Sequence, residues 1–187
     1  MAELRVLDLG AGEGGVAAQL FPEATIVTVD SDREMKPDVL CDVRHLPHDL
    51  GEFDVVVASH ILEHLPRLHV APVLLMWVSH IKMGGRLQLH VPDLGWAAKV
   101  LMRAQGVVEA GILLHIYGDQ GNEWGFHRCG FTALLLRALL QGAGLWVERL
   151  ESLPYQIVTT GEEGSKSTYD AKQLVAQAIK MEVPGGD

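Results

Sequence analysis

The chain has 187 residues, of which 48% are hydrophobic, and its formal net charge at pH 7 is −9. This length predicts one domain that can bury a substantial core. An acidic chain without clustered Lys and Arg is a poor match for a phosphate backbone, so we expect no nonspecific nucleic-acid binding.

Cysteine content and hydropathy limit the compartment. Two cysteines, Cys41 and Cys129, are too few for a disulfide framework. The longest apolar-rich stretch, residues 70–81, is too short for a bilayer, which takes about 20 helical residues. The first predicted strand starts within the first few residues, which leaves no room for a secretory signal. We therefore expect a cytoplasmic protein without a membrane partner.

The first predicted element is a buried strand at residues 4–9, followed by a glycine-rich turn at residues 10–15. Glycines in this turn accept positive φ and let a ligand approach the backbone. Asp8 comes just before the turn, and we expect it to face that ligand. The same letters also fit the Gly-x-Gly-x-x-Gly fingerprint of dinucleotide-binding folds, so the turn alone leaves the cofactor open.

Three further strand-like runs follow. Residues 25–29 are closed by Asp30, twenty positions after the first glycine of the turn, where a carboxylate can accept both hydroxyls of a ribose. Residues 39–41 are closed by Asp42, and residues 53–58 form another run. Strands that alternate with helices predict a parallel sheet, whose carboxyl edge binds ligands. We therefore expect both carboxylates at one edge.

The second half continues the pattern after an interruption. A packed helix is predicted to put Leu74, Leu75, Val78 and Ile81 on one face. Residues 94–130 interrupt the alternation, with turn formers at 115–121, and predict an inserted lid or substrate-binding segment. The predicted helices are 70–81, 96–105 and 132–140, followed by a predicted strand at 146–150 and a last element near 173–179.

These elements resemble the class I S-adenosylmethionine-dependent methyltransferases, in particular the small-molecule, type 11-like group. The motifs lie in the family's order, and they are DLGAGEG at 8–14, VD at 29–30, CDV at 41–43, FDVVVASHILEHL at 53–65, GGRL at 84–87 and VPD at 91–93. The later segment HRCGFT at 127–132 is similar to the family's approach to its sixth strand.

The resemblance implies a Rossmann-like, doubly wound α/β fold with three layers, α/β/α. Its mostly parallel seven-stranded sheet would end in an antiparallel strand at residues 174–179, although the residues alone also allow a helix there. A single methyltransferase domain would span residues 1–187, with a mobile loop at 161–167 and a flexible tail at 182–187.

The resemblance also implies the cofactor S-adenosylmethionine, which becomes S-adenosylhomocysteine. The glycine turn would lie along its methionine portion, Asp30 would bind the ribose, and Asp42 with the Val43 amide would read the adenine edge. Ser59 and His60 would close the amino-acid end. The whole predicted cofactor set is Asp8, Gly10, Ala11, Gly12, Asp30, Ser31, Asp42, Val43, Ser59 and His60.

A methyl group on a sulfonium is already activated, so we expect in-line displacement in which positioning contributes most. The acceptor would be a small or sugar-like molecule, bound by His115, Tyr117, His127 and Arg128. His60 and His127 are the candidate catalytic bases, because a neutral imidazole can take a proton near pH 7. We expect His64 to face the core, and no metal ligand is assigned.

Three other functions compete with methyl transfer. Residues 60–64 match the His-x-x-Glu-His pattern of zinc peptidases, without an obvious third ligand. The glycine turn also suits an NAD-dependent oxidoreductase, although Asp42 and residues 59–64 count against it. The third is a noncatalytic S-adenosylmethionine-binding scaffold. The short spacing between Asp30 and Asp42 truncates a crossover helix, so we expect residues 94–130 or a partner subunit to supply a lid, which leaves a homodimer open.

Overall fold

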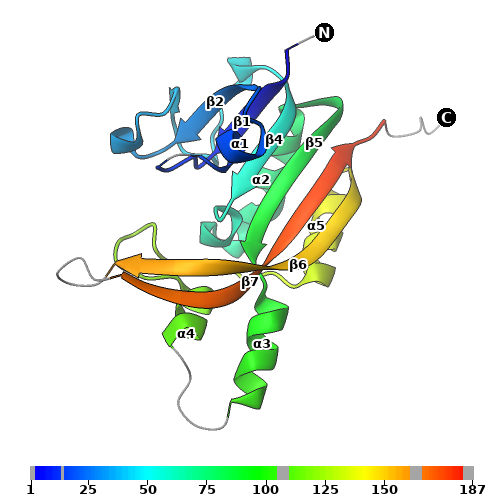
Figure 1. The fold of residues 1–187 in the computed structure, drawn as a ribbon. Helices are drawn as coiled ribbons and strands as arrows, with labels where there is room; N and C mark the ends of the chain where they lie inside the picture. Colours follow the sequence, from blue (N-terminus) through cyan, green and yellow to red (C-terminus); the bar gives the residue numbers. More distant parts are fainter. Residues whose placement is uncertain (1–2, 14, 105–109, 161–165, 183–187) are drawn as a thin grey trace.

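The computed structural model describes residues 3–13, 15–104, 110–160 and 166–182. In those ranges a seven-stranded sheet has the order β3-β2-β1-β4-β5-β7-β6 (Figure 1). Its strands are β1 (Arg5–Leu9), β2 (Thr25–Asp30), β3 (Val39–Leu40), β4 (Phe53–Ser59), β5 (Ile81–Pro92), β6 (Leu145–Thr160) and β7 (Lys166–Lys180). The α-helices are α1 (Val16–Leu20), α2 (Arg67–Ser79), α3 (Leu94–Arg103), α4 (Ala110–Tyr117) and α5 (Ala133–Gly142). Three short 3₁₀ helices are η1 (Arg33–Met35), η2 (His48–Leu50) and η3 (Leu62–His64).

Pairing between strands confirms the predicted doubly wound class. Strands β3, β2, β1, β4 and β5 pair in parallel, whereas β7 lies antiparallel between β5 and β6. The predicted antiparallel last strand is therefore correct. The crossover between β2 and β3 contains only the three-residue η1, as the short spacing between Asp30 and Asp42 predicted.

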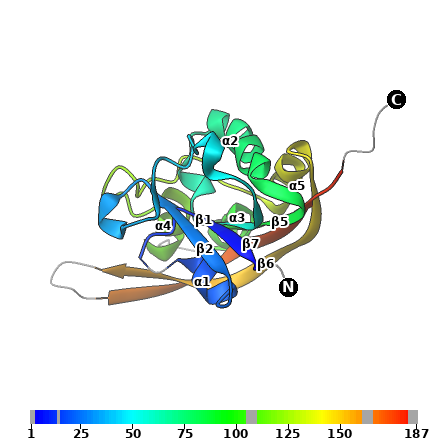
Figure 2. The ribbon, with the colours of Figure 1, turned by 90° about the horizontal axis from the view of Figure 1, so that it is seen from above.

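The central strands are buried on both faces. In β1, Leu7 and Leu9 belong to the main core with α2 and α5, whereas Val6 belongs to a smaller cluster with Ala17 of α1. In the view from above, α2 and α5 lie on one side of the sheet and α1 on the other (Figure 2). Because side chains alternate along a strand, covering both faces requires a nearly continuous apolar run, which β1 and β4 have.

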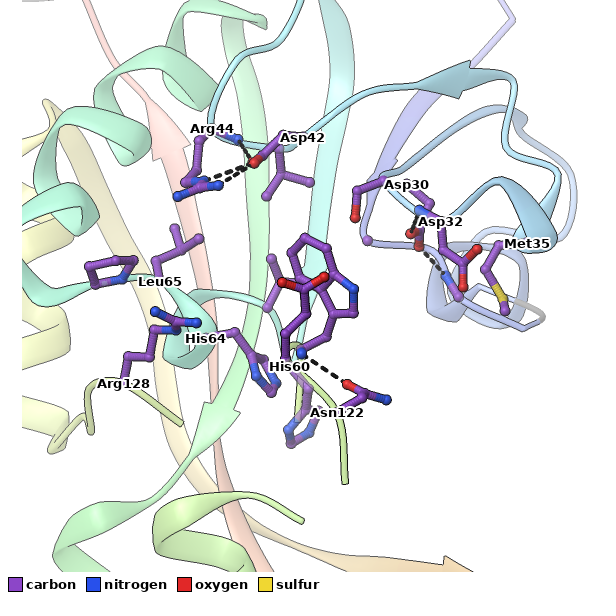
Figure 3. Close-up of a pocket in the computed structure, with 18 residues that line it drawn as sticks. Asp30, Asp32, Met35, Asp42, Arg44, His60, His64, Leu65, Asn122 and Arg128 are labelled. Carbon is purple, nitrogen blue, oxygen red and sulfur yellow. Dashed lines mark hydrogen bonds and ion pairs between the residues drawn. The ribbon is translucent and has the colours of Figure 1, made fainter. Parts of the chain in front are cut away.

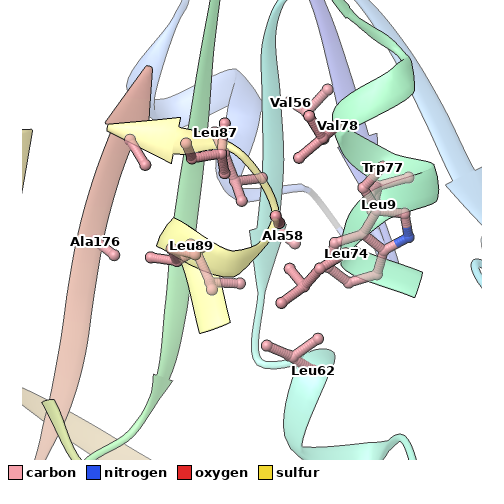
Figure 4. Packing of buried hydrophobic residues seen from close by; sticks show 14 of the residues in the cluster. Leu9, Val56, Ala58, Leu62, Leu74, Trp77, Val78, Leu87, Leu89 and Ala176 are labelled. Atoms are coloured by element: carbon pink, nitrogen blue, oxygen red, sulfur yellow. The ribbon is translucent and has the colours of Figure 1, made fainter. Parts of the chain in front are cut away.

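Helix α2 contributes the largest share of helix side chains to the main core. Leu74 and Trp77 are fully buried, and they lie beside Leu9 of β1 and Ala58 of β4 (Figure 4). Two members of the predicted apolar face are wrong: Leu75 is 55% exposed, and Ile81 begins β5 instead of ending the helix. The helix ends at Ser79 because the chain must turn there to enter the parallel strand.

The residues that flank the predicted insertion at 94–130 lie next to each other in the structure. Asp93 and Phe131 form an isolated parallel bridge, so the two ends of the segment meet beside the end of β5. Within it, α3 and α4 lie below the sheet in Figure 1. Residues 115–117 end α4, which corrects the prediction that turn formers begin at 115.

The sixth and seventh strands are much longer than predicted. Strand β6 continues ten residues beyond the predicted end at 150, and β7 starts eight residues before the predicted start at 174. The two pair over their length as a hairpin that extends past α4 (Figure 1). Residues 161–165 of the predicted mobile loop and 183–187 of the predicted tail lie outside the described residues. In the described ranges, no helix is long and apolar enough to cross a membrane.

Leu74 and Leu75 give a matched test of this packing. We expect Leu74→Ala to lower the free energy of unfolding by about 2–5 kcal/mol, because it leaves a cavity in the core. Leu75→Ala, one residue away on the exposed face, changes it by no more than about 0.5 kcal/mol. Urea denaturation of both variants checks this, and equal losses would contradict the observed orientation of α2.

Candidate active site

A cavity of about 470 Å³ opens at the carboxyl ends of β1, β2 and β4 (Figure 3). Such a volume lies within the usual range for small-molecule and cofactor sites. It is lined by Gly10, Gly12, Asp30, Ser31, Asp32, Met35, Asp42, Val43, Arg44, His60, Ile61, His64, Leu65, Pro66, Asn122, Glu123, Trp124 and Arg128. We call it the nucleotide cavity, after the group that the sequence predicts there.

The glycine turn and the end of β2 are joined by one carboxylate. Gly12 donates its backbone N–H to Asp30 Oδ2 at 2.9 Å, and Asp32 donates its backbone N–H to Asp30 Oδ1 at 2.9 Å. Gly10 has a φ of +65°, and a side chain there would collide with Ile61. Backbone therefore forms this wall of the cavity, with Asp30 at its edge.

The loop after β3 carries an ion pair that sequence reasoning missed. Arg44 donates its Nε–H to both carboxylate oxygens of Asp42, at 3.0 and 2.9 Å. These hydrogen bonds lower the pKa of Asp42 below its usual range. Trp77 Nε1–H donates to the Val43 carbonyl at 2.8 Å, so α2 holds this loop from the core side. The predicted role of Asp42 at adenine stays a prediction.

Three residues of the predicted cofactor set, Asp8, Ala11 and Ser59, do not line the nucleotide cavity. Asp8 is buried beneath the turn, where it accepts the Ala17 N–H at 3.1 Å, and this burial raises its pKa. The expectation that Asp8 faces a ligand is therefore wrong in this structure, because its carboxylate is used to hold the start of α1. The Ser59 hydroxyl lies 3.4 Å from His90 Nδ1.

A second cavity, of about 240 Å³, adjoins the first, and we call it the acceptor cavity. His60 and His64 line both cavities. The remaining walls come from η3, the inserted segment and β6, namely Glu63, Leu114, Gly118, Asp119, Gly125, His127, Tyr155, Ile157 and Val158. No β6 residue of this wall was predicted, because the sequence interpretation ended that strand at 150.

His60 and Glu63 form a coupled pair between the cavities. His60 has a φ of +54°, and its Nδ1 donates to Glu63 Oε1 at 3.2 Å while its Nε2 lies 2.9 Å from Gln173 Oε1. Burial alone would lower the pKa of His60, but the contacts with Glu63 and Gln173 raise it above its usual value. Burial opposes ionisation of Glu63 as well, yet the bond from His60 lowers its pKa. The contact between them therefore favours the protonated form of His60, which makes it a less ready proton acceptor than a free imidazole.

The four residues of the predicted acceptor set separate in the structure. His127 lines the acceptor cavity, and burial lowers its pKa, so its ring is neutral near pH 7. Arg128 lines the nucleotide cavity instead. His115 is buried, with its Nε2 3.2 Å from the Asp93 carbonyl, and Tyr117 is 54% exposed and lines neither cavity. Helical geometry explains the last two, since α4 turns Tyr117 away from the side that packs.

His64 does not face the core, which corrects the prediction. It is half-buried, lines both cavities, and donates its Nδ1–H to the Phe126 carbonyl at 3.1 Å. His60 ends β4 and His64 lies in η3, so the two are not one turn apart on an α-helix. The structure thus lacks the helical histidine pair that the zinc-peptidase pattern requires.

The inserted segment reaches the nucleotide cavity through a part that the sequence did not single out. Asn122, Glu123 and Trp124 line its outer wall. Asn122 Oδ1 accepts the Trp124 N–H at 2.9 Å, which orders the turn. The nearest sequence signal was the predicted cluster of turn formers at 115–121, just before these residues, which indicates a loop but not where the loop folds.

Comparison with known proteins agrees with this geometry. A family model described as a methyltransferase domain matches residues 2–150, which is most of the chain. No curated protein matches the sequence significantly.

Solved structures share the fold at low identity. BH2331 from Bacillus halodurans C-125 has a TM-score of 0.68 and 16% identity, over 97% of this chain and 94% of that one. The 1,6-didemethyltoxoflavin-N1-methyltransferase of Burkholderia thailandensis, with bound 1,6-didemethyltoxoflavin and S-adenosylhomocysteine, has a TM-score of 0.62 and 19% identity, over 96% of this chain and 72% of that one. The magnesium protoporphyrin IX methyltransferase of Synechocystis PCC 6803, with bound S-adenosylhomocysteine, has a TM-score of 0.58 and 16% identity, over 95% of this chain and 74% of that one.

The family match spans the glycine turn, Asp30, Asp42 and the segment after β4, which are the parts that build the nucleotide cavity. The chain therefore belongs to the methyltransferase domain family and is a class I S-adenosylmethionine-dependent methyltransferase.

Proposed function

We propose that the chain transfers the methyl group of S-adenosylmethionine to a small-molecule acceptor by in-line displacement. One observation carries this proposal: the nucleotide cavity and the smaller acceptor cavity meet at His60 and His64. A cofactor in the first cavity can point its methyl group at that junction, and an acceptor in the second can approach from the opposite side. Holding the two in line is the main contribution that the protein has to make.

The cofactor assignment follows from the chemistry of the walls. Asp30 offers its carboxylate at the end of β2, where ribose hydroxyls can donate to it. The backbone of the glycine turn is open to close approach because Gly12 has a φ of +53° and open space where a side chain would be. Asp42 and Val43 line the same cavity from the loop after β3, where they can meet the base end of a nucleoside.

The acceptor class follows from size and polarity. At about 240 Å³ the acceptor cavity is smaller than the roughly 300–1,000 Å³ that holds drug-sized ligands, so it suits a molecule of about one ring. Its walls combine apolar groups, Leu114 and Ile157, with the imidazole of His127 and the ring of Tyr155. Near pH 7 the neutral His127 ring can take a proton from an acceptor hydroxyl, whereas the contact with Glu63 favours the form of His60 that already carries one.

Asp30 tests the cofactor site. We expect Asp30→Ala to weaken S-adenosylhomocysteine binding about ten- to a hundredfold, because each hydrogen bond to a charged group contributes about 1.5–3 kcal/mol. Isothermal titration calorimetry measures this, with Glu23→Ala as the matched surface carboxylate that lines neither cavity. Two results would count against the proposal: binding of NAD without binding of S-adenosylhomocysteine, or an affinity for S-adenosylhomocysteine that Asp30→Ala does not change.

Leu114 and Leu113 test the acceptor cavity. Leu114 lines it, whereas its neighbour Leu113 is 46% exposed and lines neither cavity. A panel of single-ring hydroxyl and amine acceptors is screened first by the release of S-adenosylhomocysteine. We then expect Leu114→Trp to raise the acceptor KM by about tenfold or more, the equivalent of about 1.4 kcal/mol, without changing cofactor affinity.

We expect Leu113→Trp to leave both the acceptor KM and the cofactor affinity unchanged. A noncatalytic scaffold would instead bind the cofactor and release no product with any acceptor on the panel. Equal effects of the two tryptophans on KM would place the acceptor elsewhere.

A further inference from the structure

Three side chains that could hold a metal ion converge on the acceptor cavity. Glu63 and His64 come from η3, and His127 comes from the inserted segment, 63 residues further along the chain than His64. One ligand atom from each lies within 4.8 Å of the other two. All three line the acceptor cavity, and His64 also lines the nucleotide cavity. The cluster therefore lies at the junction where an acceptor would meet the methyl group.

Glu63 has an oxygen that no other group in the described part of the chain satisfies. Its side chain is 1% exposed, and its Oε1 accepts from His60 while its Oε2 has no hydrogen-bond partner there. Leaving a buried carboxylate oxygen unpaired is expensive, and most buried polar atoms in proteins are paired. A cation beside Oε2 would remove this deficit.

The two histidines are already oriented as metal ligands are. His64 donates its Nδ1–H to the Phe126 carbonyl at 3.1 Å, and His127 donates its Nδ1–H to the His115 carbonyl at 3.1 Å. In that tautomer the Nε2 of each ring carries a free lone pair. Metal-bound histidines commonly donate their other ring N–H to a backbone carbonyl, which fixes both tautomer and ring orientation.

We propose that Glu63, His64 and His127 bind one divalent transition-metal ion of the zinc class, and that the acceptor is an oxygen compound whose hydroxyl coordinates this ion. The proposal deepens the proposed function and rests on it for the identity of the acceptor cavity. Two imidazoles and one carboxylate are a common donor set for catalytic zinc, with positions left open for a substrate oxygen.

The spacing of the ligand atoms is compatible with such a site. Ligand atoms bound at about 2.0–2.2 Å from one zinc ion lie within about 4.4 Å of one another, and the three atoms here lie within 4.8 Å, so at most a small shift of the side chains is needed. These rings already meet edge to face, with centroids 4.9 Å apart. His60 would remain on Glu63 Oε1 and orient the carboxylate from outside the ligand set.

A bound ion would give the site a second way to activate the acceptor. Coordination lowers the pKa of a hydroxyl, so its proton leaves to water without a protein base. The alkoxide oxygen then forms a bond with the methyl carbon, and the electron pair of the carbon–sulfur bond returns to sulfur. In this scheme His127 is a ligand and does not accept the proton.

The test uses Co²⁺ alone as the probe, titrated into full-length protein that has been treated with EDTA. We expect one equivalent to bind, with visible ligand-field absorption and a calorimetric isotherm. His127→Ala and His64→Ala should each weaken binding by about tenfold or more, because they remove direct ligands. His69→Ala, at an exposed histidine of α2 that lines neither cavity, should bind as the unchanged chain does.

S-adenosylhomocysteine titrations on the same samples separate the two proposals. His127 does not line the nucleotide cavity, so His127→Ala should bind Co²⁺ more weakly but bind S-adenosylhomocysteine as the unchanged chain does. Unchanged S-adenosylhomocysteine binding also shows that the variant is folded. The metal site is wrong if Co²⁺ fails to bind the unchanged chain, or if His127→Ala and His64→Ala bind Co²⁺ as tightly as the unchanged chain does. The methyltransferase assignment survives either result. If the unchanged chain does not bind S-adenosylhomocysteine, the proposed function is overturned, whatever the Co²⁺ result.

Discussion

Parallel pairing of β1 with β2 on one side and β4 on the other is the constraint on which the rest of this molecule depends. It brings the ends of three strands to one edge, where each must be followed by a turn that leaves the sheet. The turn after β1 is closed by the bond from Gly12 to Asp30, so the carboxylate that faces the nucleotide cavity also fixes the shape of its glycine wall. Binding and local folding are therefore coupled in one side chain.

The junction between the cavities depends on a different kind of constraint, the burial of charge. Glu63 is held in the interior by His60, and the segment after β4 bends sharply enough at His60 to present three polar side chains in five residues. Structural and chemical roles overlap here. The same carboxylate favours the protonated form of His60 and keeps one oxygen without a hydrogen-bond partner in the described part of the chain, beside the imidazoles of His64 and His127.

The inserted segment and the long hairpin complete the site from far along the chain. The bridge between Asp93 and Phe131 closes the insertion at its base, so His127 and Arg128 are delivered to adjoining cavities by one short stretch. Strand β6 passes beside it and adds Tyr155 and Ile157. The inserted segment therefore contributes walls to both cavities, whereas β6 lines only the acceptor cavity.

The sequence by itself determined the sheet class, the first four strands, α2, α3 and α5 within a few residues, and the position of Asp30, Asp42 and the glycine turn at one edge. These follow from local patterns: apolar runs of strand length, glycines, and acidic residues at strand ends. The orientation of His64, the burial of Asp8 and the extension of β6 were decided only by tertiary structure. The orientation of a single polar side chain depends on its hydrogen-bond partner. The partners here, the Phe126 carbonyl for His64 and the Ala17 N–H for Asp8, lie in other segments of the chain, so a local sequence pattern does not identify them. The strand extension depends on pairing with β7, whose energy no local pattern records, because each strand of a hairpin is stabilised by the other.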